Sequence, residues 1–148
     1  MMLALASDHG GFELKQAVKE YLDKNGFDYE DFGCYSGEAC DYPDMAKLAC
    51  DAVVDGRCDK ALLFCGTGIG ISMAANKVKG IRAAACSDWF SAKYTRAHND
   101  ANALCLGGRV VGPGLAIEMV DVFLHTEFEG GERHTRRISK VMALEEER

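Results

Sequence analysis

A cysteine followed by a glycine-rich turn is the clearest candidate for chemistry in this 148-residue sequence. Residues 65–70 read Cys-Gly-Thr-Gly-Ile-Gly, between an apolar run and a stretch of helical periodicity. Glycines let the backbone turn sharply and approach a ligand closely. The first amides of a helix have no internal partner, so they can face an anion. Such amides favour a thiolate, which makes Cys65 a candidate base or nucleophile, although most buried cysteines are inert.

Three further groups of polar residues could supply acid–base chemistry or bind a phosphate. Asp8 and His9 follow an apolar run and offer a carboxylate and an imidazole, or simply a helix cap and a surface histidine. His98 closes a predicted helix, where a cation also suits the helix dipole. Arg133 and Arg137 are four residues apart, so they share a helix face that could hold one phosphate or merely be solvated. Together these groups indicate a site for a small phosphorylated substrate.

Five apolar runs alternate with segments of helical periodicity, as expected of an α/β fold. Strands are predicted at Met2–Ala6, Phe27–Phe32, Lys60–Phe64, Ile81–Cys86 and Ala103–Leu106. Helices are predicted through Leu14 to Leu22, from Tyr42 to Val53, from Ile71 to about Val78, from the N-cap Asp88 to Ala97, from Pro113 onward, and in the tail. This pattern predicts a three-layer α/β/α fold with a five-stranded, mostly parallel, Rossmann-like sheet and a C-terminal helical tail.

The predicted strands bring the candidate residues together. Parallel sheets of this kind bind their ligands at the carboxyl ends of the strands. Asp8 follows the first strand, Cys65 ends the third and Arg109 follows the fifth. We therefore expect all the candidates, His98 and the tail arginines included, to gather at one end of the sheet.

Composition narrows the class of protein. Hydrophobic residues make up 48% of the chain and charged residues 27%, which is typical of one soluble globular domain over residues 1–148. The formal net charge of −6 argues against nucleic-acid binding, and no apolar run reaches the roughly 20 residues of a membrane span. The N-terminal residues lack a basic region, so we expect no signal peptide and a cytoplasmic location.

The seven cysteines form no Cys-x-x-Cys pair and have no histidines at zinc-like spacing, so we expect no metal and mostly buried, reduced thiols. The tail, residues 131–148, is charged and contributes few apolar side chains, namely Ile138, Val141, Met142 and Leu144. It has too little apolar surface to fold alone, and we expect it to pack on a partner chain.

Five segments of the sequence resemble the type B ribose-5-phosphate isomerases, a family that includes the galactose-6-phosphate isomerase subunits. The segments are Ala6-Ser7-Asp8-His9-Gly10-Gly11, Cys65-Gly66-Thr67-Gly68-Ile69-Gly70, Ala74-Ala75-Asn76-Lys77, His98-Asn99-Asp100-Ala101-Asn102 and Arg133-His134-x-x-Arg137. The resemblance runs the full length and keeps order and spacing. It implies an aldose–ketose isomerase that works through an enediolate without metal or cofactor.

The resemblance also implies roles for individual residues. Cys65 would be the base that moves a proton between C1 and C2, and Thr67 would assist proton movement between the two oxygens. Asp8 and His98 would open the furanose ring. The enediolate oxygen would lie in an anion hole formed by the amides of Gly66, Gly68, Ile69 and Gly70. Substrate would be bound by Tyr42 in the sugar pocket, by Asn99 at the hydroxyls, and at the phosphate by His9, Arg109, Arg133 and Arg137.

One branch of the family uses a glutamate six residues after the cysteine position, where this chain has Ile71. Cys65 is therefore the only candidate base in the turn. The resemblance further implies a homodimer in which each site takes residues from both subunits, with pairing into a tetramer left open.

We expect interconversion of D-ribose 5-phosphate and D-ribulose 5-phosphate. Two alternatives stay open: an isomerase of a hexose 6-phosphate such as allose or galactose 6-phosphate, and a non-catalytic phosphosugar-binding module. A dinucleotide or nucleoside triphosphate site is not expected, because the Gly-x-Gly-x-x-Gly spacing and the Walker lysine are absent.

Overall fold

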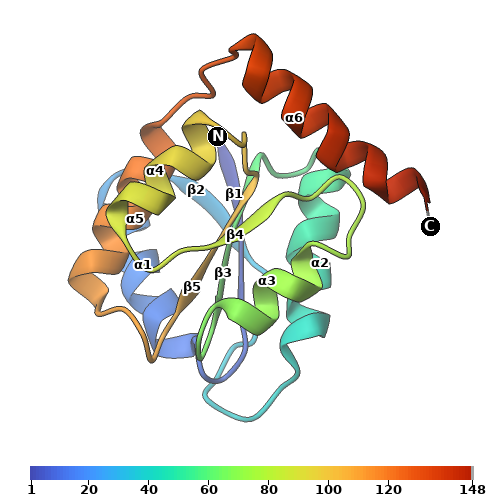
Figure 1. The fold of residues 1–148 in the computed structure, drawn as a ribbon. Helices are drawn as coiled ribbons and strands as arrows, with labels where there is room; N and C mark the ends of the chain where they lie inside the picture. Colours follow the sequence, from blue (N-terminus) through green and yellow to red (C-terminus); the bar gives the residue numbers. More distant parts are fainter. Residues whose placement is uncertain (148) are drawn as a thin grey trace.

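A computed structural model describes residues 1–147, and in it strands alternate with helices (Figure 1). The strands are β1 (Met2–Ser7), β2 (Asp28–Asp31), β3 (Lys60–Cys65), β4 (Ala83–Ala85) and β5 (Ala103–Gly107). The helices are α1 (Phe12–Lys24), α2 (Tyr42–Val54), α3 (Ile69–Ala75), α4 (Trp89–Ala97), α5 (Pro113–His125) and α6 (Glu132–Ala143), with a 3₁₀ turn at Leu144–Glu147. The predicted three-layer α/β fold is confirmed. Arg148, the last residue of the predicted tail, lies outside the described residues.

The five strands form one sheet, in the order β2-β1-β3-β5-β4, and all neighbouring strands are parallel. β3 is central, and its end lies between those of β1 and β5, with Ser7 opposite Phe64 and Cys65 opposite Gly107. β2 and β3 lie on opposite sides of β1, so the β1–β2 and β2–β3 connections run in opposite directions along the sheet. Such a switch point opens a crevice at the carboxyl ends of the strands.

Helices cover both faces of the sheet, with α1, α4 and α5 on one side and α2 and α3 on the other (Figure 1). Side chains alternate along a strand. On β3, Leu62 and Phe64 therefore pack against the first group of helices, whereas Leu63 and Cys65 pack against the second. Both faces of β3 are buried, which explains why its sequence is a continuous apolar run.

The fourth strand and the third helix differ from the prediction. β4 covers only Ala83–Ala85, because Ile81 is held in a turn by the carbonyl of Val78. The backbone N–H of Arg82 donates to the Asn102 side chain at 2.7 Å. α3 begins at Ile69 rather than Ile71 and ends early at Ala75.

Most of the cysteines are buried thiols of the core, as the sequence analysis predicted. Five are buried, and all seven are free thiols. Burial raises the pKa of Cys50 to about 12 and that of Cys86 to about 11, as expected of inert core thiols. Cys34 and Cys40 differ from the expectation, because both are partly exposed in the connection between β2 and α2.

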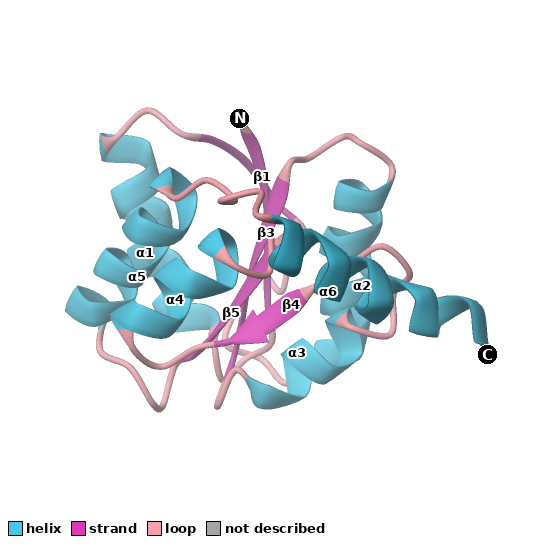
Figure 2. Ribbon diagram, turned by 45° about the horizontal axis from the view of Figure 1, so that its top comes forward, coloured by secondary structure: helices cyan, strands magenta, loops and turns pink. Residues whose placement is uncertain are grey.

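Figure 2 shows α6 in the foreground, running from beside the sheet past α2, with its C-terminal end reaching beyond the body of the molecule. No side chain of α6 is buried among the described residues.

Within residues 1–147 no helix has the length and apolar character needed to cross a membrane. The single-domain organisation and the cytoplasmic location stay predictions.

A buried lysine fixes the connection that leads from β2 toward the end of β1. Lys15 on α1 is 0% exposed, and its Nζ donates to Asp31 Oδ1 at 2.8 Å and to the carbonyl of Cys34 at 2.6 Å. Asp31 also accepts from Lys19 at 3.0 Å and from the backbone N–H of Gly33 at 2.9 Å. Replacing one member of a buried ion pair leaves its partner without full compensation.

We expect Lys15→Met to lower the free energy of unfolding by about 3 kcal/mol, because it removes two buried hydrogen bonds and a charge partner of Asp31. Urea denaturation followed by circular dichroism measures the change. The matched control is Lys47→Met, which removes an exposed pair with Asp51 and should leave the midpoint nearly unchanged. Equal destabilisation by the two variants would contradict the role given to Lys15.

Asp31 also makes the fold sensitive to acid. Burial alone raises the pKa of Asp31, but hydrogen bonds from Lys15, the Gly33 N–H and Lys19 outweigh burial and hold the pKa below its usual value. A carboxylate with a lowered pKa stabilises the fold above its unfolded pKa of about 3.9 and loses this contribution as the pH falls through the folded value. We expect the urea midpoint to drop below about pH 4, and to drop less steeply in Asp31→Asn. Parallel pH profiles for the two proteins would contradict this.

Candidate active site

Cys65 is the last residue of β3 and is only 4% exposed. Its Sγ accepts the backbone N–H of Gly68 at 3.1 Å, so the glycine turn folds back over the thiol. Gly68 has a φ of +78°, and a methyl group at this position would lie 2.9 Å from the carbonyl carbon of Leu106. Both the turn and its contact with β5 therefore require glycine. The hydrogen bond directs a partial positive charge at the sulfur, where a thiolate would be stabilised.

Glycines pack the loops after β1, β3 and β5 against one another, backbone to backbone. A Cβ on Gly10 would lie 3.0 Å from the nitrogen of Gly66, and one on Gly108 would lie 2.5 Å from the Gly10 oxygen. A Cβ on Gly107 would lie 2.6 Å from the backbone of Thr67. These close approaches bring the residues that flank the glycines to the edge of the sheet where Cys65 lies.

Asp8 and His9 reach this edge from β1. Asp8 is 7% exposed, and its Oδ1 accepts the backbone N–H groups of Gly10 at 2.9 Å and Gly11 at 3.1 Å. Asp8 therefore caps its own turn with one oxygen. His9 is exposed, and its Nδ1 accepts the backbone N–H of Cys40 at 3.3 Å. A neutral His9 consequently carries its proton on Nε2, where it can donate to a ligand.

Arg109 and Tyr42 lie against the glycine turn from two other elements. The backbone N–H of Arg109 donates to the carbonyl of Gly66 at 2.9 Å, and its Nη1 lies 3.0 Å from where a Gly66 Cβ would stand. The Tyr42 ring, at the start of α2, lies 2.8 Å from where a Gly70 Cβ would stand. We call the residues at this edge the cysteine cluster: Asp8, His9, Tyr42, Cys65 to Gly70, and Arg109.

The amides of the turn are partly engaged already. The Gly68 N–H donates to Cys65, and the Ile69 N–H donates to Thr67 Oγ1 at 3.2 Å. The N–H groups of Gly66, Thr67 and Gly70 have no acceptor among residues 1–147. Of the four amides expected in an anion hole, Gly66 and Gly70 are therefore available to a ligand, whereas Gly68 and Ile69 are hydrogen-bonded within the turn.

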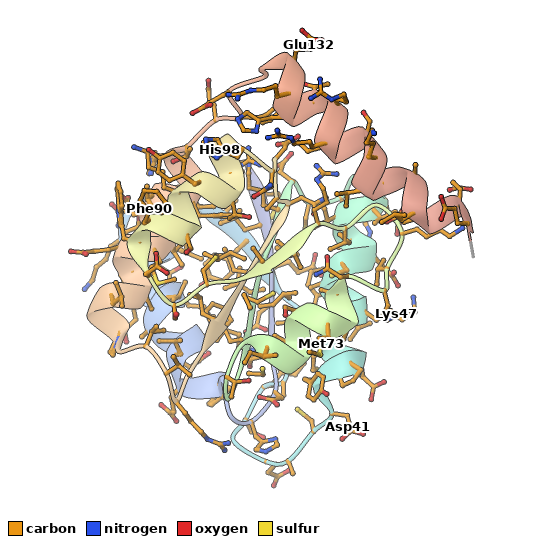
Figure 3. All side chains as sticks on the ribbon, in the orientation of Figure 1. Asp41, Lys47, Met73, Phe90, His98 and Glu132 are labelled. Carbon is orange, nitrogen blue, oxygen red and sulfur yellow. The ribbon has the colours of Figure 1, made fainter. Side chains whose placement is uncertain are left out.

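His98 lies at the opposite edge of the sheet, contrary to the expectation that all candidates share one end. α4 runs back from the carboxyl end of β4, so its C-cap His98 lies at the amino end of β5. Figure 3 shows His98 and Glu132 at one end of the molecule and Asp41 and Met73 at the other. A six-residue strand rises about 3.3 Å per residue, so roughly 20 Å of sheet separates the two edges.

The surroundings of His98 include Glu129 and His134, to which the sequence analysis assigned no role. Its ring stacks on that of His134, with centroids 4.3 Å apart and planes at 12°. It also contacts the ring of Tyr94 at 4.8 Å. Glu129 Oε2 lies 3.7 Å from His98 Nε2 and 3.9 Å from His134 Nε2. We call the residues of this edge the histidine cluster: His98, Asn99, Glu129, Arg133, His134 and Arg137.

Two arginines hold the turn that presents His98 and Asn99. Arg96 is 8% exposed and donates to Asp100 Oδ1 and to the carbonyl of Ala101, both at 2.8 Å. Arg82 donates to the carbonyls of Asn99 at 3.1 Å and Asp100 at 2.7 Å. Asp100 has a φ of +46°, an uncommon conformation for a residue other than glycine, so this support is needed.

A cavity of about 950 Å³ lies beneath α6, beside β4 and α4. His98, Asn99, His134 and Arg137 contribute to its wall, together with Val141 and other apolar residues, whereas the cysteine cluster does not. Arg133 and Arg137 are both exposed, as their predicted phosphate-binding role requires. On the same side of the molecule, Phe90, Val141 and Leu144 are 66%, 55% and 57% exposed.

Comparison with known proteins identifies relatives over nearly the whole chain. Residues 3–141 match the family described as Ribose/Galactose Isomerase. Ribose-5-phosphate isomerase B of Escherichia coli (strain K12) is 45% identical, over 99% of this chain and 97% of that protein. The structure of Clostridium thermocellum ribose-5-phosphate isomerase B superposes with a TM-score of 0.97 at 48% identity, covering 99% of each chain. A structure of Mycoplasma genitalium ribose-5-phosphate isomerase B with bound ribulose-5-phosphate superposes with a TM-score of 0.93 at 44% identity. The match covers 99% of this chain and 97% of that one.

Proposed function

The chain belongs to the Ribose/Galactose Isomerase family, and from this premise we propose that it interconverts D-ribose 5-phosphate and D-ribulose 5-phosphate, with Cys65 as the base. The isomerase class follows from its relatives and structural neighbours. The observation that supports Cys65 is its position at the end of the central strand, where the Gly68 N–H donates to its sulfur. No other titratable side chain lies within the glycine turn.

In the proposed reaction the Cys65 thiolate takes the proton from C2 of the open-chain aldose. The C–H electron pair forms the C1–C2 double bond, and the carbonyl electron pair moves onto O1, which gives a cis-enediolate. The free N–H groups of Gly66, Thr67 and Gly70 would stabilise this oxygen, an effect worth about 10²–10³ in rate per donor. The Thr67 hydroxyl would carry a proton between the oxygens, and Cys65 would return its proton to C1.

The remaining predicted residues divide between the two clusters. In the cysteine cluster, Asp8 would take part in ring opening, His9 and Arg109 would bind the phosphate, and Tyr42 would line the sugar pocket. In the histidine cluster, His98 would also act in ring opening, while Asn99 would bind hydroxyls and Arg133 and Arg137 would bind the phosphate. The two clusters lie at opposite ends of one sheet, so one chain cannot bring both to one substrate.

We therefore propose a homodimer in which the histidine cluster of each subunit faces the cysteine cluster of the other. An arrangement of this kind is self-complementary under two-fold symmetry, and so both sites would be completed at once. The unburied α6 and the exposed Phe90, Val141 and Leu144 supply apolar surface for such an interface. The same arrangement would give the predicted tail its partner chain.

A substrate comparison in heavy water tests the proposal. We expect kcat/KM to be higher for ribose 5-phosphate than for allose 6-phosphate or galactose 6-phosphate. We also expect ribulose 5-phosphate to carry deuterium at C1 by NMR. The family description includes galactose, so a higher kcat/KM for a hexose 6-phosphate would replace the pentose assignment by the hexose alternative. Absence of turnover with every sugar phosphate would overturn the proposed activity.

A further inference from the structure

Three side chains of the histidine cluster converge, and the proposed isomerase reaction uses only one of them, His98. His98, Glu129 and His134 each offer one possible metal-ligating atom, and these atoms all lie within 4.8 Å of one another. The Glu129 carboxylate lies between the two imidazoles, at 3.7 Å and 3.9 Å. The side chain of His134 is only 18% exposed, while those of His98 and Glu129 are half-exposed.

The backbone holds these three residues together across three elements. The Glu129 N–H donates to the Ala97 carbonyl at 3.0 Å, which fixes the connector beside the end of α4. Gly130, with a φ of +73°, lets the chain turn toward α6, whose first turn contains His134. His98 is itself the C-cap of α4. The cluster therefore does not depend on one mobile loop.

The donor set fits a first-row transition-metal dication. Zn²⁺ binds imidazole nitrogens at about 2.0–2.1 Å and carboxylate oxygens at about 2.0–2.2 Å, so tetrahedral ligand atoms stand roughly 3.4 Å apart. The two distances to Glu129 Oε2 exceed this by about 0.3 Å and 0.5 Å, and all ligand-atom separations are within 4.8 Å. Because the two imidazoles are stacked, binding one ion requires their rings to rotate out of the stack so that both nitrogen lone pairs point at it. Imidazole ligands favour Zn²⁺, Co²⁺ and Ni²⁺ over Mg²⁺ and Ca²⁺. Two histidines and one glutamate leave a fourth position open to water.

We propose that His98, Glu129 and His134 bind a Zn²⁺-type dication, and that the bound cation inhibits the enzyme. The inhibitory part rests on the proposed function, which assigns His98 to ring opening. A metal bound to Nε2 takes the lone pair of that nitrogen, so His98 can no longer accept a proton there. The binding part stands on the geometry of the cluster alone.

Histidine NMR on the full-length protein tests binding without any activity measurement. With ¹⁵N-labelled histidine, one equivalent of Zn²⁺ should shift the imidazole signals of His98 and His134. His9 and His125, the other two histidines, serve as internal controls. Glu129→Gln should raise the Kd for Zn²⁺ at least about tenfold, because even partners outside the ligand set typically contribute 10–100-fold. Glu132→Gln, which changes an exposed carboxylate on α6, should leave the Kd unchanged.

Two results would overturn the site. The first is that Zn²⁺ leaves the imidazole signals of His98 and His134 unshifted. The second is a shift confined to His9, which would place Zn²⁺ near Cys40 instead. The inhibitory part is tested on ribose 5-phosphate turnover, where Zn²⁺ should inhibit the wild-type protein and Glu132→Gln alike. Glu129→Gln should resist at the same concentration. If Zn²⁺ inhibited Glu129→Gln as strongly as the wild-type protein, the inhibition would come from Zn²⁺ on the Cys65 thiolate and the inhibitory part would be wrong. If the protein had no isomerase activity, the proposed function would fail while the NMR experiment would still test the metal site.

Discussion

We expect Cys65→Ser to lower kcat/KM for ribose 5-phosphate by about a thousandfold, the usual loss when a positioned acid–base group is removed. A serine hydroxyl is nearly the same size as the thiol and can still accept the Gly68 N–H, so the turn should keep its shape. It is a far weaker acid than a thiol, however, and no thiolate-like base would be present near neutral pH. Cys65→Ser should lower kcat and leave KM nearly unchanged, because other residues bind the substrate.

The matched control for this variant is Cys58→Ser. Cys58 is also 4% exposed, but it lies before β3, at the opposite end of the strand from Cys65. We expect Cys58→Ser to keep nearly full activity, and thermal unfolding to show that both proteins are folded. If Cys65→Ser retained more than about a tenth of the wild-type kcat/KM, the loss would fall below the usual range for a catalytic base, and another group would have to move the proton.

Local sequence signals were sufficient to predict most of the elements that carry the two clusters. β3 is a continuous apolar run because helices cover both of its faces. Pro43 opens α2 within its first turn, and Asp88 caps α4 by accepting the Ser91 N–H at 2.7 Å. Each of these features depends on residues close in sequence, so composition and spacing indicate them directly.

The division of the candidates into two clusters could not be read from spacing. The predicted order of elements does imply it, because a helix between two parallel strands returns the chain to their amino edge, and His98 ends the helix before β5. No sequence feature indicated a role for Glu129, because only the turn at Gly130 and the backbone hydrogen bond to Ala97 bring it beside His98. The sequence likewise did not indicate that Arg82 and Arg96 support the turn at Asp100, since both donate to backbone carbonyls.

A second large effect follows from the two clusters: a mixture of Cys65→Ser and His98→Gln subunits should regain activity that neither protein has alone. Each homodimer would carry its defect in both sites, with losses of about a hundredfold or more. In a hybrid, the intact Cys65 of one chain would face the intact His98 of the other, so one of two sites is complete. Random pairing makes half of the dimers hybrids, and we expect about a quarter of wild-type activity.

Co-expression of the two chains with different affinity tags, followed by purification on both tags in turn, isolates the hybrid for kinetic assay. The matched control pairs Cys65→Ser with Asp8→Asn, because these two residues belong to the same cluster and the same edge of one sheet. In that hybrid every site contains one defect, and activity should stay at the level of the single variants. Recovery in the control, or none in the Cys65–His98 hybrid, would mean that the two clusters do not meet across a subunit interface. The His98 edge would then have to act on a different ligand from the one that Cys65 faces.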